Sequence, residues 1–464
     1  MIRIFSIPSL LAGEQPVGEL PSEKEMYGTF LKLAWPSVIE AVLVGLVGLV
    51  DSLMVATLGD NAISAVGITQ QPKMVIMCIM FALNVGITAV VARRKGEGNR
   101  EGANHAMRNG LFVGLGLILL TSFLGRQFAE PFLRFAGAHD SFIDDSVAYF
   151  RIITFSVIFQ CMNGAINAAQ TGSGNSRISM TSNLVGNIVN ICFNYLLING
   201  IGPFPRLEVR GAAIATAMGA MVAFSVSFVR LLNKKNYINF FYKAPWKLSS
   251  VTLKPITKVA SSALIEQLCM RVGFFLFTKI VAGLSDLAYT THVACMNFLS
   301  LSFCCGDGFQ VASTSLAGQS LGARRPDKAV IYCNIGQRVV FFVALTLSIL
   351  MITLRKDIMR LYSSTPEVVQ MGSILMLYMA VITYIQTAQV IYTGCLRGAG
   401  DTRFTAITAM VSVGFVRPFF GYILTYVVGW GLYGAWLAIM LDQLCRFVMN
   451  FSRIKQKKWL KIRL

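Results

Sequence analysis

Long apolar runs recur along the whole chain and constrain its fold more than any other feature of the sequence. Each run reaches about 20 residues, the length of helix that crosses the hydrocarbon core of a bilayer. About twelve such runs are found, near residues 33–57, 72–92, 108–126, 147–169, 179–200, 210–232, 256–282, 288–316, 331–353, 372–394, 404–428 and 431–452. Backbone groups in hydrocarbon must be bonded within the segment, so runs this long indicate helices rather than barrel strands. The sequence therefore predicts an all-α polytopic membrane protein with about twelve transmembrane helices.

The charge of the chain supports this class and indicates its orientation. Only 14% of the residues are charged, against about 25% in soluble domains. The net charge of +19 comes from Lys and Arg that gather in alternate connections and in the C-terminal tail, while acids such as Asp140 and Asp144 occupy the intervening connections. This positive-inside pattern predicts that both termini are cytoplasmic. Basic segments at helix ends are expected to meet membrane lipids, and no nucleic-acid partner is expected.

The reactive side chains form no recognisable catalytic or metal-binding pattern. The ten cysteines sit mostly alone inside apolar runs and the three histidines are scattered, so neither a disulfide framework nor a metal site is expected. The sequence contains no HExxH, GxSxG or P-loop motif. We therefore expect no cofactor and no enzymatic activity, and an ion gradient as the energy source.

Two short polar segments resemble each other across a fixed distance. AQTGSGNSRIS at 169–179 and GCLRGAGDTRF at 394–404 both separate apolar runs. The residues that match at an offset of 226 positions are Gly172 and Gly398, Gly174 and Gly400, and Arg177 and Arg403. Because the offset also relates other positions, the chain is predicted to be an internal duplication with six helices in each half. An even number of crossings makes the two lobes parallel, related by an axis along the membrane normal.

The duplication predicts the organisation of the chain. The expected parts are an N-terminal cytoplasmic or interfacial segment (1–29), an N-lobe (30–232), a cytoplasmic linker (233–255), a C-lobe (256–452) and a basic cytoplasmic tail (453–464). The linker is expected to tolerate change. Two parallel lobes suit a transporter that works by alternating access, whereas a channel would repeat a selectivity filter, and none is visible.

Several motifs together resemble the MATE (multidrug and toxic compound extrusion) family, and the resemblance extends from about residue 28 to 452. The motifs that carry it are AQTGSGNSRIS, GCLRGAGDTRF, AGQSLGARRPDKA after the eighth run, VRGAAIATAMG at the sixth and VDSLMVATLG at the end of the first. The DinF-like branch is the nearest. The resemblance implies a cation-coupled antiporter with twelve helices in two bundles that exports organic, often cationic, compounds.

The repeated glycine motifs have a structural interpretation. Gly172, Gly174, Gly398 and Gly400 end the fourth and tenth helices, where glycine supplies a C-cap and a sharp turn. Asn175 and Asp401 are expected to cap the helices that follow. The arginines of the motifs, including Arg177, Arg397 and Arg403, are expected to anchor at the cytoplasmic interface. Contact with substrate is the alternative.

Asp51 is the leading candidate for a coupling residue. An ionisable side chain at bilayer depth is costly and marks a functional site by default, and burial makes binding of H⁺ or Na⁺ competitive. The MATE resemblance implies a cation-binding or protonated aspartate at this position. A carboxylate held by hydrogen bonds for packing alone is the alternative.

Amide side chains form the second set of candidates. Asn183, Asn187, Asn190 and Asn194 share one face of the fifth helix, and such a stripe can ligate a cation or hold a neighbouring helix. In the DinF-like branch a second aspartate occupies the position that matches Asn194, so this chain departs from a two-carboxylate site. Asn190 and Asn194 are assigned to the cation site. Gln160 and Asn163 on the fourth helix are substrate-cavity candidates.

Three further acids are candidates for lining the substrate cavity. Glu40 precedes Asp51 by eleven residues, which places both on nearly the same helix face, about 16 Å apart. Glu266 is the counterpart of Glu40 in the second lobe, so both could instead hold a structural contact repeated in the two lobes. Asp307 is either a cavity residue or part of an internal ion pair with Lys279 or Arg271.

These observations favour an antiporter. We expect small organic substrates, coupling to H⁺ or Na⁺, a multi-pass location in the cell membrane and a monomeric protein. The alternative is a flippase for a lipid-linked precursor, since such proteins share the two-lobed architecture. A flippase should carry a strongly cationic central cavity and often additional helices.

Overall fold

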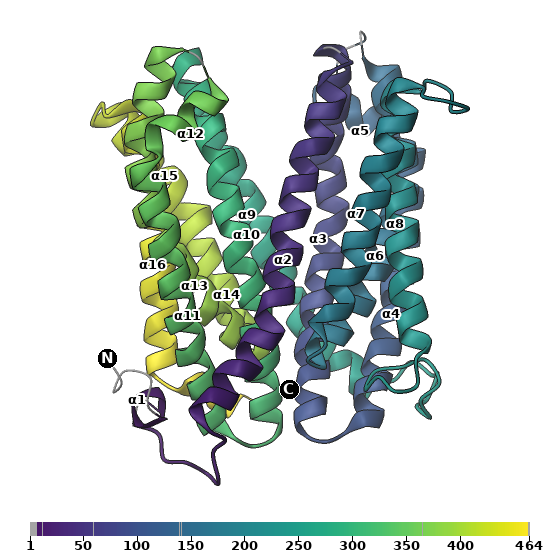
Figure 1. The fold of residues 1–464 in the computed structure, drawn as a ribbon, viewed down its shortest axis with the longest axis vertical. Coiled ribbons are helices and arrows are strands. Elements are labelled where there is room, and N and C mark those ends of the chain that lie inside the picture. Colours follow the sequence, from purple (N-terminus) through teal and green to yellow (C-terminus); the bar gives the residue numbers. More distant parts are fainter. Residues whose placement is uncertain are drawn as a thin grey trace. The chain divides into compact units, whose positions relative to one another are not determined.

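The computed structural model describes residues 7–11, 13–58, 60–138, 140, 142–363 and 365–462, which form helices and no strand. The first half of the chain contains α1 (Ile7–Leu11), α2 (Glu23–Ala56), α3 (Asp60–Gly96), α4 (Arg100–Gln127), α5 (Ala129–Phe135), α6 (Ile143–Gly172), α7 (Ser176–Asn199) and α8 (Glu208–Leu232) (Figure 1). Long helices joined by short connections are what the apolar runs predicted.

The second half repeats this order. It contains α9 (Ser250–Ala282), α10 (Asp286–Gly322), α11 (Pro326–Thr353), α12 (Arg355–Tyr362), α13 (Pro366–Ala399), α14 (Thr402–Ala409), α15 (Arg417–Tyr422) and α16 (Gly431–Lys455). The π-helical segments Met410–Val416 and Ile423–Val427 join α14 and α15 into one continuous span and extend it. A short 3₁₀ turn, Lys458–Lys461, follows α16.

Within the described residues, nine helical spans are long and apolar enough to cross a membrane. The three other predicted spans, 179–200, 256–282 and 288–316, coincide with α7, α9 and α10, which have 24, 33 and 37 residues. At 1.5 Å per residue, even the shortest of these helices exceeds the hydrocarbon thickness of about 30 Å. Polar side chains, including the asparagine stripe of α7, lower their hydropathy. The fold is therefore an all-α polytopic membrane protein in two lobes.

The described chain separates into two compact units. One contains Met1–Val38 and Ser261–Leu464, and the other contains Ile39–Ala260. In the unit Ile39–Ala260, α3 packs against α6 and α6 packs against α8. In the other unit, the matching helices pack in the same order, α10 against α13 and α13 against α16. The duplication in sequence is thus a duplication of helix packing within each unit.

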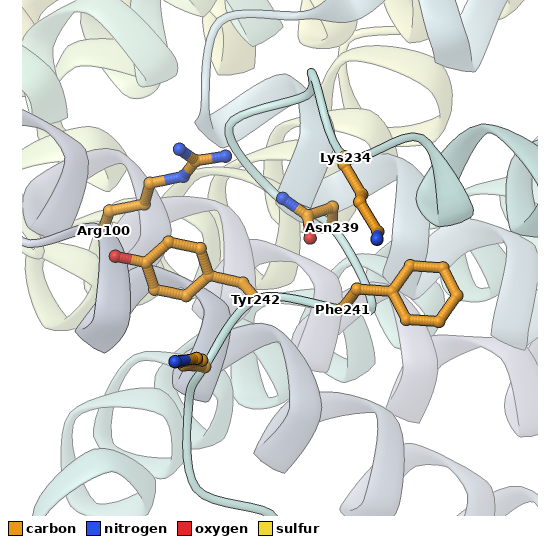
Figure 2. Close-up of a pocket in the computed structure, with 6 residues that line it drawn as sticks. Arg100, Lys234, Asn239, Phe241 and Tyr242 are labelled. Carbon is orange, nitrogen blue, oxygen red and sulfur yellow. The ribbon is translucent and has the colours of Figure 1, made fainter.

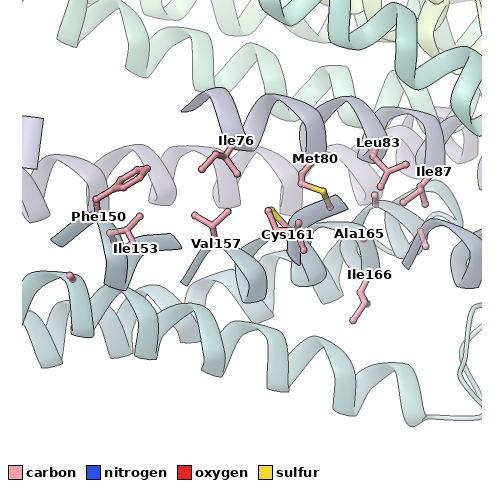
Figure 3. Packing of buried hydrophobic residues seen from close by; sticks show 14 of the residues in the cluster. Ile76, Met80, Leu83, Ile87, Phe150, Ile153, Val157, Cys161, Ala165 and Ile166 are labelled. Carbon is pink, nitrogen blue, oxygen red and sulfur yellow. The ribbon is translucent and has the colours of Figure 1, made fainter. Parts of the chain in front are cut away.

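The core of Ile39–Ala260 consists of apolar faces at helical spacing. Figure 3 shows side chains of α3 packed beside side chains of α6. The labelled residues are Ile76, Met80, Leu83 and Ile87 on α3, and Phe150, Ile153, Val157, Cys161, Ala165 and Ile166 on α6. Recurrence every three or four residues places such side chains on one face of each helix.

The repeated glycines have two distinct roles, of which the sequence predicted one. Gly174 and Gly400 adopt left-handed backbone angles, with φ of +82° and +85°, as the turns require. Gly172, by contrast, permits close helix packing, because a Cβ there would lie 2.7 Å from the carbonyl oxygen of Thr88. Gly398 meets the carbonyl oxygen of Thr314 in the same way. Thr88 and Thr314 are themselves 226 positions apart, so this contact is part of the duplication.

The expected side-chain caps are absent from these two motifs. Asn175 and Asp401 occupy the N-cap positions of α7 and α14, but neither side chain makes a capping hydrogen bond. The carboxylate of Asp401 instead accepts a 2.7 Å bond from Nε of Arg453 on α16. Arg177 and Arg403 are exposed, and their anchoring role stays a prediction.

The linker between the halves is bound to α4, and its tolerance to change stays a prediction. Nε and Nη2 of Arg100 donate to the carbonyl oxygens of Tyr237 and Asn236 at 2.9 and 2.7 Å. One turn further, Asn104 donates to the Tyr237 carbonyl at 3.1 Å and accepts from the backbone N–H of Asn239 at 2.9 Å. Side chains on one face of α4 therefore fix the backbone of the linker.

Arg108 continues this face of α4 by one more turn. Its guanidinium donates to the carbonyl oxygens of Phe240, Tyr242 and Ala244 and lies over the ring of Trp246. Three carbonyls held by one buried arginine make the linker a folded part of its unit.

The N-terminal segment is bound to the unit that contains the second half. The side chain of Asn334 on α11 donates to the carbonyl oxygen of Leu10 at 2.7 Å. The carboxylate of Asp327 accepts from the backbone N–H of Val17 at 3.1 Å, and Arg325 donates to the carbonyl oxygen of Gly18 at 3.2 Å. The segment thus packs along α11.

Candidate functional site

Asp51 lies on α2 and is hydrogen-bonded by the asparagine stripe of α7. Nδ2 of Asn194 donates to its carboxylate at 2.6 Å. The hydrogen-bonding groups around Asn190 are satisfied when its amide nitrogen faces Asp51 and its amide oxygen faces Thr216. In this orientation Asn190 donates to both oxygens of Asp51 at 2.9 and 3.2 Å and accepts from the backbone N–H of Thr216 at 3.2 Å. Both asparagines are buried. The structure therefore brings together the three residues that the sequence assigned to the cation site.

One atom of this site has no partner. Oδ1 of Asn194 is buried and makes no hydrogen bond, although a buried carbonyl oxygen normally has a donor or a cation. A carboxylate and amide oxygens are hard oxygen donors that suit H⁺ or Na⁺. Within the described residues no group of three His, Cys, Asp or Glu side chains could hold a resident metal.

Glu40 makes the same kind of contact eleven residues earlier on α2. Its Oε1 accepts from Oγ of Ser179 at 2.7 Å and from Nδ2 of Asn183 at 2.5 Å. The pairs Asp51 with Asn194 and Glu40 with Asn183 both have a separation of 143 positions. The helices α2 and α7 therefore run in register, and Glu40 and Asp51 each accept a hydrogen bond from an amide of α7.

Asn163 on α6 is hydrogen-bonded to Asn183, the residue that contacts Glu40. Its Nδ2 donates to Oδ1 of Asn183 at 2.7 Å, while its own Oδ1 accepts from Ser227 at 2.8 Å and from Asn167 at 3.1 Å. Asn163 therefore orients Asn183 through a buried network. Gln160 does not join it, because its amide donates to Ser156 on its own helix.

Lys73 on α3 is the residue that the sequence analysis missed. It interacts electrostatically with the carboxylate of Asp51, and Asp51 also interacts with the buried Tyr149 of α6. The signal was available in the sequence, since a single lysine follows Pro72 at the start of an apolar run. A protonated Lys73 offsets the negative charge of the Asp51 carboxylate through space.

Glu266, the counterpart of Glu40 in the second half, is bound by an arginine. Oε1 of Glu266 accepts from Nη2 of Arg397 on α13 at 2.6 Å, and Oε2 accepts from the hydroxyl of Thr405 at 2.9 Å. Arg397 also donates to Oε1 of Gln310 on α10 at 3.2 Å. The expectation that Arg397 anchors at the interface is therefore wrong, since its side chain is only 14% exposed and forms an internal ion pair.

Asp307 is exposed on α10. The charged group that acts on it is Arg397, the partner of Glu266. The ammonium of Lys279, one of the two partners expected for Asp307, lies 5.6 Å from the ring centre of Phe275 instead. Arg397 thus forms an ion pair with Glu266 and acts on Asp307 only through space.

Together, a two-lobed helical fold and buried acids held by amides and cations define a polytopic membrane transporter. A sequence model of the MatE family matches residues 36–196 and 262–423. The two matched segments fall in the two halves of the duplication. The chain belongs to the MatE family, whose members are transporters rather than enzymes.

Relatives of similar length support this membership. The chain is 25% identical to the probable multidrug resistance protein NorM of Thermotoga maritima over 98% of this chain and 97% of that protein. It is 23% identical to the uncharacterized transporter YisQ of Bacillus subtilis, over 95% and 96% of the two chains. Over 82% of its length it is 25% identical to the multidrug resistance protein PmpM of Pseudomonas aeruginosa, 80% of which is covered.

Solved structures share the fold. One is an outward-facing conformation of a multidrug resistance MATE family transporter of the MOP superfamily, with a TM-score of 0.87, 20% identity and coverage of 97% and 98% of the two chains. Another is a MOP superfamily transporter from Pyrococcus furiosus with a reversed polarity of its binding pocket, with a TM-score of 0.87, 19% identity and coverage of 98% of both chains.

Proposed function

We propose that this protein is a cation-coupled antiporter that exports small organic compounds by alternating access of its two lobes, with Asp51 as the coupling acid. The observation that carries the proposal is the contact of Asp51 with Asn194 at 2.6 Å and with Asn190 on α7. The names of the relatives that are multidrug resistance proteins support the substrate class.

The geometry suggests how Asp51 couples ion binding to conformation. Its ligands come from α7, while Lys73 lies on α3 and Thr216 on α8. Any shift of α2 against these helices changes the number of amide bonds that the carboxylate receives. A difference in cation affinity between the inward and outward states is what drives such a cycle.

The counterpart of Glu40 in the second lobe is not an open carboxylate. Glu266 is already neutralised by Arg397 at 2.6 Å and by a hydrogen bond from Thr405. Since arginine does not lose its proton in proteins, this acid has a permanent counter-ion. We therefore assign the exchanging cation to Asp51 and a structural role to Glu266.

The orientation and oligomeric state belong to the same proposal. The positive-inside pattern of the basic connections and tail supports cytoplasmic termini, and we propose a monomer as the working unit. Glu40, Gln160, Asn163 and Asp307 are proposed to contribute to substrate binding, Glu40 and Asn163 through their shared contact with Asn183.

The test is transport in proteoliposomes with independently imposed ΔpH and ΔNa⁺ and with ethidium as the substrate. Asp51→Asn keeps the volume of the side chain and removes its titratable charge. We expect this variant to fold and bind ethidium but to lose gradient-driven efflux, while Glu40→Gln loses less. Efflux at the wild-type rate by a folded Asp51→Asn protein would show that the coupling acid lies elsewhere.

A further inference from the structure

The linker that follows α8 is rich in positive charge and contains no acid. No Asp or Glu occurs between Glu208 and Glu266. Within this interval, residues 230–258 contain seven cations: Arg230, Lys234, Lys235, Lys243, Lys247, Lys254 and Lys258. Because α4 fixes the linker backbone through Arg100, Asn104 and Arg108, these charges belong to a folded surface rather than to a mobile tether.

Part of this surface is a groove of about 320 Å³. Figure 2 shows the side chains that line it. The lining residues are Arg100, Lys234, Asn239, Phe241, Tyr242 and Lys243. Three of the six are cations and none is an acid. An anion in the groove would meet two lysine ammonium groups and the amide of Asn239.

Aromatic rings hold the groove in shape. The Arg100 guanidinium lies 4.7 Å from the ring centre of Tyr242, and the Lys234 ammonium lies 5.4 Å from that of Phe241. Nε and Nη2 of Arg100 bind linker carbonyls, which leaves Nη1 available to a ligand. The groove is therefore built from positioned groups rather than from extended lysines alone.

The groove lies beside the ends of two membrane spans. The linker connects the end of one membrane span, α8, with α9, and it is bound to the first turns of another span, α4. Beside the lysines, Phe241, Trp246 and Leu248 are 55%, 49% and 60% exposed. Exposed aromatic and apolar side chains among lysines are typical of the headgroup level of a membrane.

We propose that this groove binds the phosphate of an anionic phospholipid, with Lys234, Lys243 and Asn239 on the phosphate and Phe241 and Trp246 beside the upper acyl chains. A zwitterionic phosphatidylcholine carries its own cation and should bind more weakly. The site does not depend on transport. Only its assignment to the cytoplasmic leaflet rests on the proposed orientation.

The test measures binding of short-chain phosphatidylglycerol to the full-length purified protein by native mass spectrometry. Lys234→Gln/Lys243→Gln removes two groove cations and leaves Arg100, which holds the linker. At about five-fold for each cation near a lipid phosphate, we expect this variant to bind about 25-fold more weakly. Both lysines are exposed, so the thermal unfolding of the variant should match that of the wild type.

The matched control is Lys235→Gln/Lys254→Gln, which removes the same charge from the same exposed segment but outside the groove. We expect a change of less than about five-fold. An equal loss of phosphatidylglycerol affinity in both double variants would overturn the proposed site and indicate a non-specific attraction to the charge of the whole linker. Binding of phosphatidylcholine as tight as that of phosphatidylglycerol would overturn it as well. Inorganic phosphate or glycerol phosphate that binds as tightly as the lipid would assign the groove to a soluble phosphate compound.

Discussion

Removing Arg397 should destabilise the protein more than removing its partner Glu266. Their charged atoms are 2.6 Å apart, and the side chains are 14% and 5% exposed. Loss of one member of a buried ion pair costs about 3–5 kcal/mol, because the other charge stays desolvated. Arg397→Met leaves the Glu266 carboxylate with the Thr405 hydroxyl alone and deprives Asp307 of the cation that acts on it. We therefore expect Arg397→Met to lower the free energy of unfolding by about 5 kcal/mol, the upper end of the range.

Glu266→Gln should cost less, about 1–3 kcal/mol. The glutamine still offers an oxygen to Thr405 or Arg397, and Arg397 keeps its hydrogen bond to Gln310. The double variant Glu266→Gln/Arg397→Met has neither charge. Its loss should therefore fall short of the summed single losses by about 2 kcal/mol, since interacting residues are not additive.

The free energy of unfolding is measured for the purified protein by titration with SDS. Arg403→Met is the control, because Arg403 is exposed in the same motif, and a change within about 0.5 kcal/mol is expected. Single losses that add up in the double variant would refute the ion pair as a stabilising unit. An Arg397→Met protein as stable as Arg403→Met would refute it as well.

Three further outcomes follow from individual contacts. Gly172→Ala should lower stability by about 1–3 kcal/mol through overpacking, whereas Gly116→Ala, whose Cβ would meet open space, should raise it by up to about 1 kcal/mol in the same SDS titration. Arg108→Ala frees three linker carbonyls, so limited trypsin digestion should cut the linker faster than in the wild type. Lys73→Met removes the cation beside Asp51, and we expect ΔNa⁺ to drive ethidium efflux by this variant but not by the wild type; Na⁺-driven wild-type efflux would contradict this.

The fold could be predicted from the sequence because its signals are local or periodic. The length of each apolar run determines a helix, and the offset of 226 between Gly172 and Gly398 reveals the duplication. The same offset relates Thr88 to Thr314, but the sequence could not show that each threonine carbonyl lies against a glycine. That contact depends on how two helices cross, which spacing along one helix does not specify.

The candidate site was predicted where both partners lay on helix faces of known period. The asparagine stripe and the eleven-residue spacing of Glu40 and Asp51 each define a face, and the structure brings these faces together. The sequence could not predict which residues form ion pairs where the pairing depends on the direction of a long side chain. Arg397 looked like an interfacial anchor by its position near a helix end, yet it reaches inward to Glu266.

The charges around Asp51 bear on the choice of ion. The resemblance to the DinF-like branch implies a second aspartate where this chain has Asn194, and Lys73 acts electrostatically on Asp51. With Asp51 ionised and Lys73 protonated, the two groups together are neutral, whereas two aspartates would be doubly negative. Sodium needs several oxygen ligands and gains little from a neutral site, whereas a proton needs only one carboxylate oxygen. Both features favour a proton over Na⁺ as the coupling ion, and the Lys73→Met variant under an imposed ΔNa⁺ tests this expectation.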